Sequence, residues 1–137
     1  MQAHPYLNFP GTCAEAFRFY VGLFGAAIDM EMTHGGTPMA DMVPPDWQDK
    51  IMHIQMRTPD GMVLMGSDAP PPYYAKPQGF AVSLQMGDPA EAERVYAALA
   101  EGGEVRMELQ KTFWAERFAM LSDRFGIPWI INCAGSA

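Results

Sequence analysis

The stretch that decides the fold is Ala14-Glu-Ala-Phe-Arg-Phe-Tyr20, because the chain repeats it as Ala90-Glu-Ala-Glu-Arg-Val-Tyr96. Both copies have the apolar spacing of an amphipathic helix. Both are preceded at the same offset by a residue that favours a helix N-terminus, Thr12 in the first copy and Asp88 in the second. A glutamate follows each of these residues at the third position, which is the pattern of a capping box. The match predicts a duplicated module rather than an array of short repeats.

Alternating or short apolar segments surround each predicted helix, and such segments are typical of β-strands. One segment precedes each helix and three follow it, so each module is predicted to have the order βαβββ. Gly61 and Gly126 mark equivalent hairpin turns before the last strand of each module. The fold class is therefore α+β, in two tandem modules. The predicted strands are residues 5–9, 26–33, 51–57, 62–67, 80–86, 104–109, 118–122 and 127–133.

A proline-rich stretch separates the two modules. Residues 69–78 contain four prolines and two tyrosines, a composition that predicts a stiff linker in a polyproline-like conformation. We therefore expect a first module over residues 1–68 and a second over residues 79–137. Inside the first module, residues 34–49 predict a long loop.

The composition is that of a globular protein. The chain has 137 residues, of which 49% are hydrophobic and 18% charged, and its formal net charge is −7. The nine basic residues form no cluster, so a nucleic-acid partner is not expected. The apolar runs are far shorter than a bilayer span and the N-terminus has no signal-peptide pattern, so we expect a cytoplasmic protein without a membrane partner. Cys13 and Cys133 are predicted to be free thiols, although the sequence leaves a disulfide between strands open.

Several motifs along the chain resemble those of one known family. They include His4-Pro-Tyr-Leu-Asn-Phe9, Met65-Gly-Ser-Asp68, Thr112-Phe-Trp-Ala115 and Phe125-Gly-Ile-Pro-Trp-Ile-Ile-Asn132. With these motifs the chain is similar to the PhnB-like family of the vicinal oxygen chelate superfamily, which includes glyoxalase I, bleomycin resistance proteins and extradiol dioxygenases. The resemblance implies two curved sheets, each backed by a helix, that pair into an incomplete barrel with a site on the concave face. It also implies a homodimer.

The resemblance further implies where a metal ion would bind. Metal-dependent members place one ligand on the first and one on the fourth strand of each module, the latter a glutamate four residues after the turn glycine. In this chain the fourth-strand positions are Met65 and Ile130, and the first-strand positions fall near Tyr6 and Ala81. These side chains are not a ligand set for a divalent ion, so we predict no glyoxalase-type metal site and no cofactor. His4 would enter only if the register slipped, and a histidine near a terminus is more often solvated.

His53 is the one residue that we predict to be catalytic. It lies on the strand face opposite Met52, Ile54 and Met56, which is the face predicted to be concave. In one interpretation it is a hydrogen-bonded histidine that supports the wall of the site. In the other it is a general base or a donor that orients a ligand. No nucleophile partner is visible in the sequence, so both interpretations stay open.

The same alternation predicts further polar groups on the concave face, which could orient a ligand or bind neighbouring strands. Trp114 and Glu116 lie in a predicted loop. Exposure of Trp114 there would indicate contact with a ligand or partner, whereas Glu116 is most simply a solvated surface acid. Phe113, Trp114 and Trp129 could form an aromatic wall, although Trp129 falls on the helix-facing side and is more simply expected in the core. The predicted ligand-binding residues are Tyr6, Asn8, Gln55, Ser67, Ser83, Trp114, Glu116 and Asn132, with Gln85 on the same face.

Three hypotheses for function follow. The first is a dimeric protein that binds a small molecule on the concave face without a metal. The second is an enzyme in which His53, with Asn8, Ser67 or Asn132, acts on a small substrate. The third is sequestration of a planar cationic drug, as in bleomycin resistance proteins, by the acidic surface and the aromatic residues. No glycine-rich loop opens a helix after a strand, so no dinucleotide or S-adenosylmethionine cradle is predicted.

Overall fold

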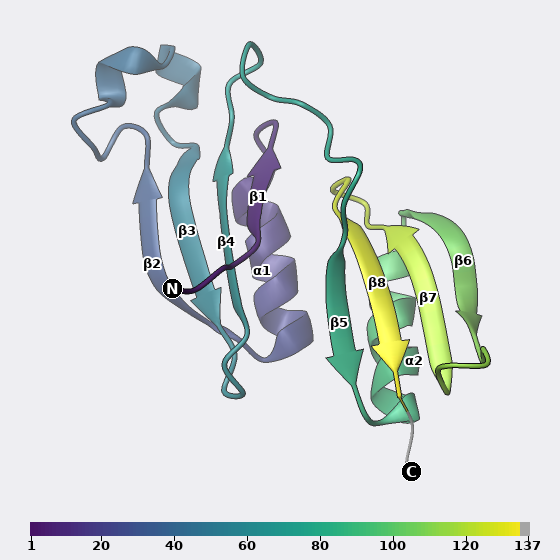
Figure 1. The fold of residues 1–137 in the computed structure, drawn as a ribbon. Helices are drawn as coiled ribbons and strands as arrows, with labels where there is room; N and C mark the ends of the chain where they lie inside the picture. The colour runs from purple at the N-terminus through teal and green to yellow at the C-terminus, as the bar shows by residue number, and fades with distance from the viewer. Residues whose placement is uncertain (135–137) are drawn as a thin grey trace. The chain divides into compact units, whose positions relative to one another are not determined.

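The computed structural model describes residues 1–134 and forms two compact units. The first unit is Met1–Ala75 and the second is Lys76–Ala137, and the boundary between them falls within residues 69–78. Residues 135–137, which belong to the second predicted module, lie outside the described residues. Each unit contains one four-stranded sheet and one α-helix (Figure 1). Among residues 1–134, no helix is long and apolar enough to cross a membrane.

The first unit has the predicted βαβββ order. Its sheet has the strand order β1-β4-β3-β2, in which β1 is parallel to β4 and the other neighbours are antiparallel. The predicted loop before β3 contains two short 3-10 helices. The elements are β1 (Tyr6–Phe9), α1 (Cys13–Phe24), β2 (Ala27–Thr33), η1 (Ala40–Met42), η2 (Pro45–Trp47), β3 (Ile51–Arg57) and β4 (Val63–Asp68).

The second unit repeats this topology. Its strand order is β5-β8-β7-β6, again with the first and last strands of the module parallel. The predicted order of elements is confirmed in both units, and the strand ends differ from the predicted ends by at most two residues. The elements are β5 (Val82–Met86), α2 (Pro89–Ala100), β6 (Glu104–Gln110), β7 (Arg117–Ser122) and β8 (Pro128–Cys133).

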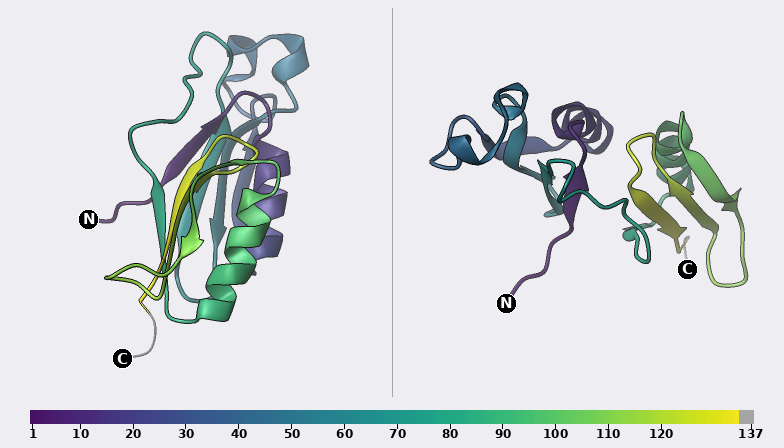
Figure 2. Two further views of the ribbon diagram at one scale, coloured as in Figure 1. Left: turned by 90° about the vertical axis from the view of Figure 1, so that its right-hand side faces the viewer. Right: turned by 90° about the horizontal axis from the view of Figure 1, so that it is seen from above.

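Each helix covers one face of the sheet in its own unit (Figure 2). The buried stripe of α1 includes Ala16, Phe17 and Tyr20, and that of α2 includes Ala92, Val95 and Leu99. The contact between α1 and β4 is close at Gly66, where a Cβ atom would lie 2.6 Å from Phe17 Cε1 and 2.9 Å from the carbonyl oxygen of Leu7. Each core therefore forms within one unit, between one sheet face and one helix.

The helix caps differ between the two units. The Asp88 side chain accepts a hydrogen bond from Ala90 N at 3.0 Å, as the sequence predicts for α2. The predicted cap at Thr12 is wrong, because its side chain makes no capping bond. The Asp68 carboxylate takes that role instead and accepts bonds from the backbone N–H groups of Gly11 and Cys13 at 3.0 and 2.9 Å. The N-terminus of α1 is thus fixed by a residue at the end of β4.

The hairpin turns have the predicted glycine conformation, whereas the linker differs in part from its predicted conformation. Gly61 and Gly126 have φ angles of 96° and 88°, which favour glycine at both hairpin turns. The linker begins with a turn in which the N–H groups of Tyr73 and Tyr74 donate to the Pro70 carbonyl at 2.8 and 3.1 Å. A polyproline-like conformation is therefore wrong for the start of the linker.

Candidate functional site

Each sheet has one face that its own helix leaves uncovered, here called the open face. In β3, Ile54 and Met56 are buried toward α1, so His53, Gln55 and Arg57 belong to the open face of the first unit. This is the face that the sequence predicts to be concave and to hold the site. The alternation of side chains predicted for β3 is therefore confirmed at these positions.

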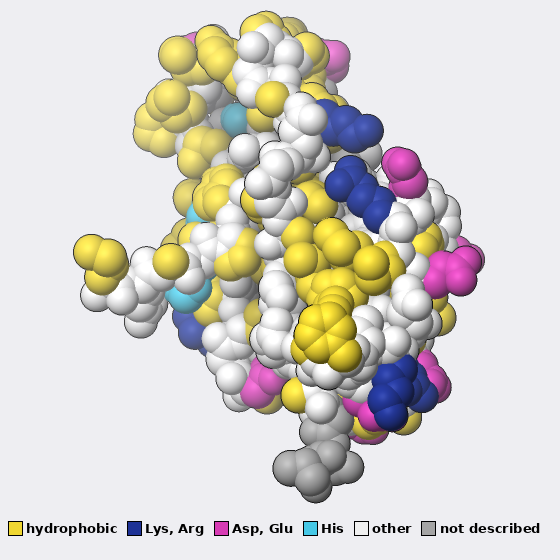
Figure 3. Space-filling model, turned by 45° about the vertical axis from the view of Figure 1, so that its right-hand side comes forward, with side chains coloured by type: hydrophobic (Ala, Val, Ile, Leu, Met, Phe, Trp, Pro, Cys, Tyr) yellow, Lys and Arg dark blue, Asp and Glu magenta, His cyan; other side chains and the backbone are white. Residues whose placement is uncertain are grey.

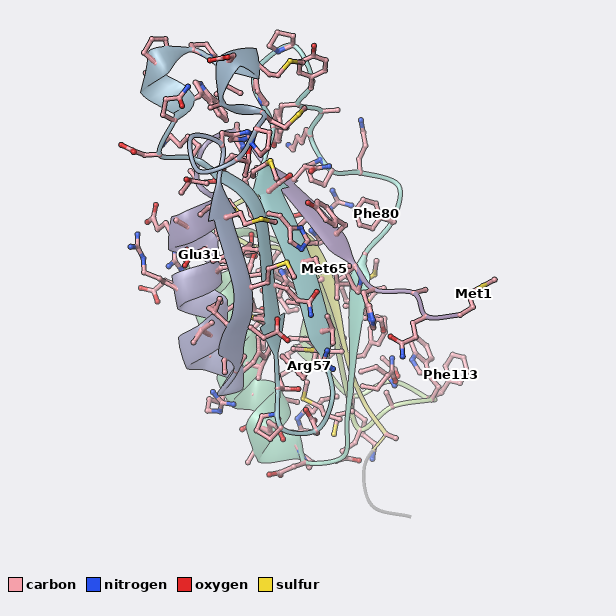
Figure 4. All side chains as sticks on the ribbon, turned by 90° about the vertical axis from the view of Figure 1, so that its left-hand side faces the viewer. Met1, Glu31, Arg57, Met65, Phe80 and Phe113 are labelled. Atoms are coloured by element: carbon pink, nitrogen blue, oxygen red, sulfur yellow. The ribbon has the colours of Figure 1, made fainter. Side chains whose placement is uncertain are left out.

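The strand register brings several predicted site residues together on this face. Tyr6 pairs with Met65 and Asn8 pairs with Ser67 across the parallel strands β1 and β4. Gln55 of β3 pairs with Met65 from the other side. The register therefore places Met65 between Tyr6 and Gln55 on the open face. Figure 4 labels Met65 and, on the same face, Arg57.

Tyr6 and His53 form a hydrogen-bonded pair. Tyr6 Oη lies 3.0 Å from His53 Nδ1, and the two rings are stacked with their centroids 5.6 Å apart. The tautomer of the imidazole decides which of the two atoms donates. Tyr6 is 43% exposed, so the pair is accessible from the open face. The His53 ring makes no other hydrogen bond within residues 1–134, which leaves its second nitrogen for a bound molecule.

The other polar groups of this face are also linked to neighbours. The Ser67 hydroxyl donates to Asn8 Oδ1 at 3.2 Å. In β2, a bulge between Ile28 and Met30 turns Asp29 toward β3. There the Asp29 carboxylate accepts bonds from Gln55 Nε2 at 3.2 Å and Arg57 Nε at 3.3 Å. These contacts fix the amide and the charges on the open face.

Two methionines extend the apolar part of this face. Met30 pairs with Gln55 and Met32 pairs with His53, so both stand on the open face, where they are 46% and 37% exposed. Met side chains of this kind form adaptable surfaces for apolar ligands. Neither Met30 nor Met32 is among the site residues predicted from the sequence. They could have been found from the sequence, because Met30 and Met32 alternate in β2 and their partners Gln55 and His53 are predicted on the open face.

The open face of the second unit has a hydrogen-bond chain of its own. Asn132 Nδ2 donates to Gln85 Oε1 at 2.8 Å, and Gln85 Nε2 donates to Ser83 Oγ at 2.7 Å. The register pairs Gln85 with Asn132 and Ser83 with Ile130. The predicted residues Ser83 and Asn132 therefore lie on one face and are joined through Gln85.

The positions that hold metal ligands in the resembling family can now be compared directly. Tyr6 faces Met65 in the first unit, and Ser83 faces Ile130 in the second. The equivalent of Tyr6 is therefore Ser83, and the predicted position Ala81 is wrong because it precedes β5. The thioether of Met65, the hydrocarbon side chain of Ile130 and two neutral hydroxyls do not fit a divalent ion of the glyoxalase type. Within residues 1–134, His, Cys, Asp and Glu form no group of three that could hold a metal.

The two remaining predicted residues, Trp114 and Glu116, have different surroundings. Trp114 is 51% exposed and contacts the rings of Phe113 and Phe118, with centroids 4.7 and 5.2 Å away. Because Phe118 pairs with Asn132, this aromatic cluster borders the open face of the second unit. Glu116 instead forms ion pairs with Lys111 and Arg117.

Three further buried side chains, Trp129, Cys13 and Cys133, belong to the core. Trp129 is 1% exposed and donates from Nε1 to Asp123 Oδ2 at 2.9 Å, so its expected place in the core is confirmed. Cys13 and Cys133 are free and fully buried. Burial, followed by the charges of Asp68 and Glu31, raises the pKa of the Cys13 thiol far above its usual range, so it is a poor nucleophile.

Comparison with known proteins places this fold. The family model described as Glyoxalase/Bleomycin resistance protein/Dioxygenase superfamily matches residues 4–131. Protein YjdN of Escherichia coli (strain K12) is 34% identical over 140 residues, which cover 96% of this chain and 95% of that protein.

Two solved structures are similar over nearly the whole chain. Protein PA1353 from Pseudomonas aeruginosa is 43% identical, with a TM-score of 0.89 and 99% of each chain covered. A protein from Bacillus cereus described as a putative 3-demethylubiquinone-9 3-methyltransferase, PhnB protein, has a TM-score of 0.81. It is 21% identical, covers 98% of this chain and 100% of its own, and shows the fold alone.

Proposed function

The chain belongs to the glyoxalase/bleomycin resistance protein/dioxygenase superfamily, and from this premise we propose that it binds a small organic molecule on the open faces of its sheets without a metal ion at the family positions. The proposed site has the same location as the site of the family, but it binds its ligand through side chains and not through a metal ion. We propose binding in preference to catalysis, because binding needs only the surface groups described above.

The observation that carries the proposal is the identity of the residues at the four paired positions. Met65 and Ile130 stand where a ligating carboxylate would be required, and their partners are Tyr6 and Ser83. The Tyr6 hydroxyl is already hydrogen-bonded to His53. Coordination of a borderline ion by this set would leave it short of oxygen or nitrogen ligands.

The same residues support binding of an organic molecule. Apolar surface with a few placed polar groups is the usual composition of a small-molecule site. In the first unit the apolar part comes from Met30, Met32 and Met65, and the Tyr6–His53 pair offers hydrogen bonds. We infer that a ligand lies over these methionines and is oriented by the hydroxyl or imidazole.

Metal analysis tests the absence of the family metal. Protein purified without added ions is expected to contain far less than one equivalent of zinc, nickel, manganese, iron or cobalt, and its melting temperature is expected not to change with a chelator. A stoichiometric metal that is lost in Tyr6→Phe or His53→Ala would contradict the proposal. Arg18→Gln, a change on exposed α1 surface, is the matched control.

A second candidate function is an enzyme in which His53 transfers a proton. The hydrogen bond between Tyr6 Oη and His53 Nδ1 favours it, because a partner on one ring nitrogen orients the other toward a substrate. His53→Ala is then expected to abolish turnover of a substrate found by screening while the melting temperature stays nearly unchanged. A large loss of stability in this variant would show that His53 supports the sheet instead.

A further inference from the structure

The two units carry opposite charges at equivalent positions of their second strands. In β2 the pairing shifts between Ile28 and Met30, which leaves Asp29 as the bulge residue. In β6 it shifts between Val105 and Met107, which leaves Arg106 at the same place in the repeat. A bulge aims its extra side chain out of the regular alternation. The duplicated fold thus directs one acid and one base onto the two open faces.

Only the first of these charges is satisfied within its own unit. Asp29 accepts bonds from Gln55 and Arg57 at 3.2 and 3.3 Å. Arg106 is exposed, and no hydrogen bond or ion pair joins its side chain to another residue among 1–134. The guanidinium therefore has all of its N–H donors available.

Arg106 borders an apolar hollow of the second unit. The hollow has a volume of about 310 Å³, and its lining includes Phe80, Met120 and Ile130. Phe80 is 54% exposed. Met120 and Ile130 pair with each other across β7 and β8, on the open face. An aromatic ring or short apolar chain in this hollow would bury apolar surface beside a cation.

Arg106 also borders a second, polar hollow of about 260 Å³. Lys76 and Arg124 line it too, so three of the nine basic residues of the chain gather here although the net charge is −7. Two acids also line it: Asp123, whose carboxylate accepts bonds from Phe125 N, Ile127 N and Trp129 Nε1, and Glu104. Surface side chains of Lys and Arg are seen beside hydrophobic ones in Figure 3.

We propose that Arg106 binds the oxyanion of a small amphiphilic molecule whose apolar body occupies the hollow formed with Phe80, Met120 and Ile130. The inference rests on the proposed function and names the ligand class for the second unit: an aromatic or short apolar carboxylate or phosphate monoester. The guanidinium fork matches either oxyanion with two parallel hydrogen bonds. The adjoining Lys76 and Arg124 strengthen the positive field around the head group.

Calorimetric titration of the full chain tests the inference with 2-naphthoate, 2-naphthyl phosphate and the neutral 2-naphthamide. The unchanged chain is expected to bind at least one anion about tenfold more tightly than the amide, the usual effect of one charge-assisted hydrogen bond. Arg106→Gln removes this preference and leaves amide binding unchanged, whereas Arg106→Lys keeps part of it. The order of the two anions separates a phosphate site from a carboxylate site.

The control is Arg94→Gln, which removes the same charge from the exposed surface of α2 and is expected to bind like the unchanged chain. Circular dichroism verifies that each variant is folded. The inference is overturned if the anions bind no more tightly than the amide, if neither anion binds, or if Arg106→Gln binds the anions with unchanged affinity. In the first case amide binding on the open face would still support the proposed function. Tighter binding of a planar cation such as acriflavine would overturn the inference and favour sequestration of cationic drugs.

Discussion

Asp68 shows how one side chain can hold several segments of a module together. Its carboxylate accepts backbone hydrogen bonds from Gly11 and Cys13 before and within α1, and from Ile51 at the start of β3. Its own carbonyl lies 3.1 Å from His34 Nε2. Asp68 is 2% exposed, so these bonds are shielded from water. The sequence marks Asp68 only as the end of a motif, because a network between distant segments leaves no local pattern.

We predict that Asp68→Asn lowers the free energy of unfolding of the chain by about 3 kcal/mol, because an amide nitrogen would face buried N–H donors. Urea denaturation followed by circular dichroism measures the change. Asp49→Asn is the control, since Asp49 is exposed, and it is expected to unfold like the unchanged chain. A loss below about 1 kcal/mol in Asp68→Asn would show that the network contributes little.

Cys13 gives the stability of the chain a predictable dependence on pH. Burial, Asp68 and Glu31 raise the pKa of its thiol in the folded state. The thiol of the unfolded chain ionises near pH 8.5. The contribution of Cys13 to the free energy of unfolding is therefore complete below about that pH and is lost as the pH rises above it. Between about pH 7 and pH 10 the unchanged chain should lose about 2 kcal/mol more than Cys13→Ala does. Equal losses in urea titrations of the two proteins would contradict this.

The order of elements could be predicted because the repeated helix, the alternating strands and the turn glycines are local signals that agree with one another. Two details of the elements could not. The cap of α1 comes from Asp68 through tertiary contact, although Thr12 has the suitable side chain. The bulges that aim Asp29 and Arg106 depend on strand register, which a single sequence specifies poorly.

The two caps lead to a prediction at the scale of the helix. Asp88→Ala should cost about 1 kcal/mol of stability, the usual effect of removing an N-cap side chain, because it loses the bond from Ala90 N. Thr12→Ala should cost only a few tenths of a kcal/mol, since Thr12 makes no such bond. Parallel urea denaturation of the two variants compares them. Equal costs would mean that Thr12 does cap α1 in solution.

At the scale of the whole molecule, duplication produced two units with the same topology and different open faces. The first presents methionines and the Tyr6–His53 pair, and the second presents Arg106 beside an apolar hollow. The predicted polar residues of each face do lie together, since their alternation follows from strand geometry. Arg106 was missed because the sequence shows neither the bulge nor the hollow. Homodimerisation and location in the cytoplasm stay predictions.

The most direct test of binding on the open faces is a methyl NMR titration of the twelve methionines with 2-naphthoate, 2-naphthamide and acriflavine. The signals of Met65 and Met120 report on the open faces of the two units. The signal of Met56, which is buried on the α1 side of its sheet, reports on the core. Saturable shifts are expected at Met65 or Met120 with at least one compound, while the Met56 signal stays unchanged. Binding on the open faces would be contradicted if no compound shifted the signal of either open-face methionine, or if the shifts appeared at Met56 instead.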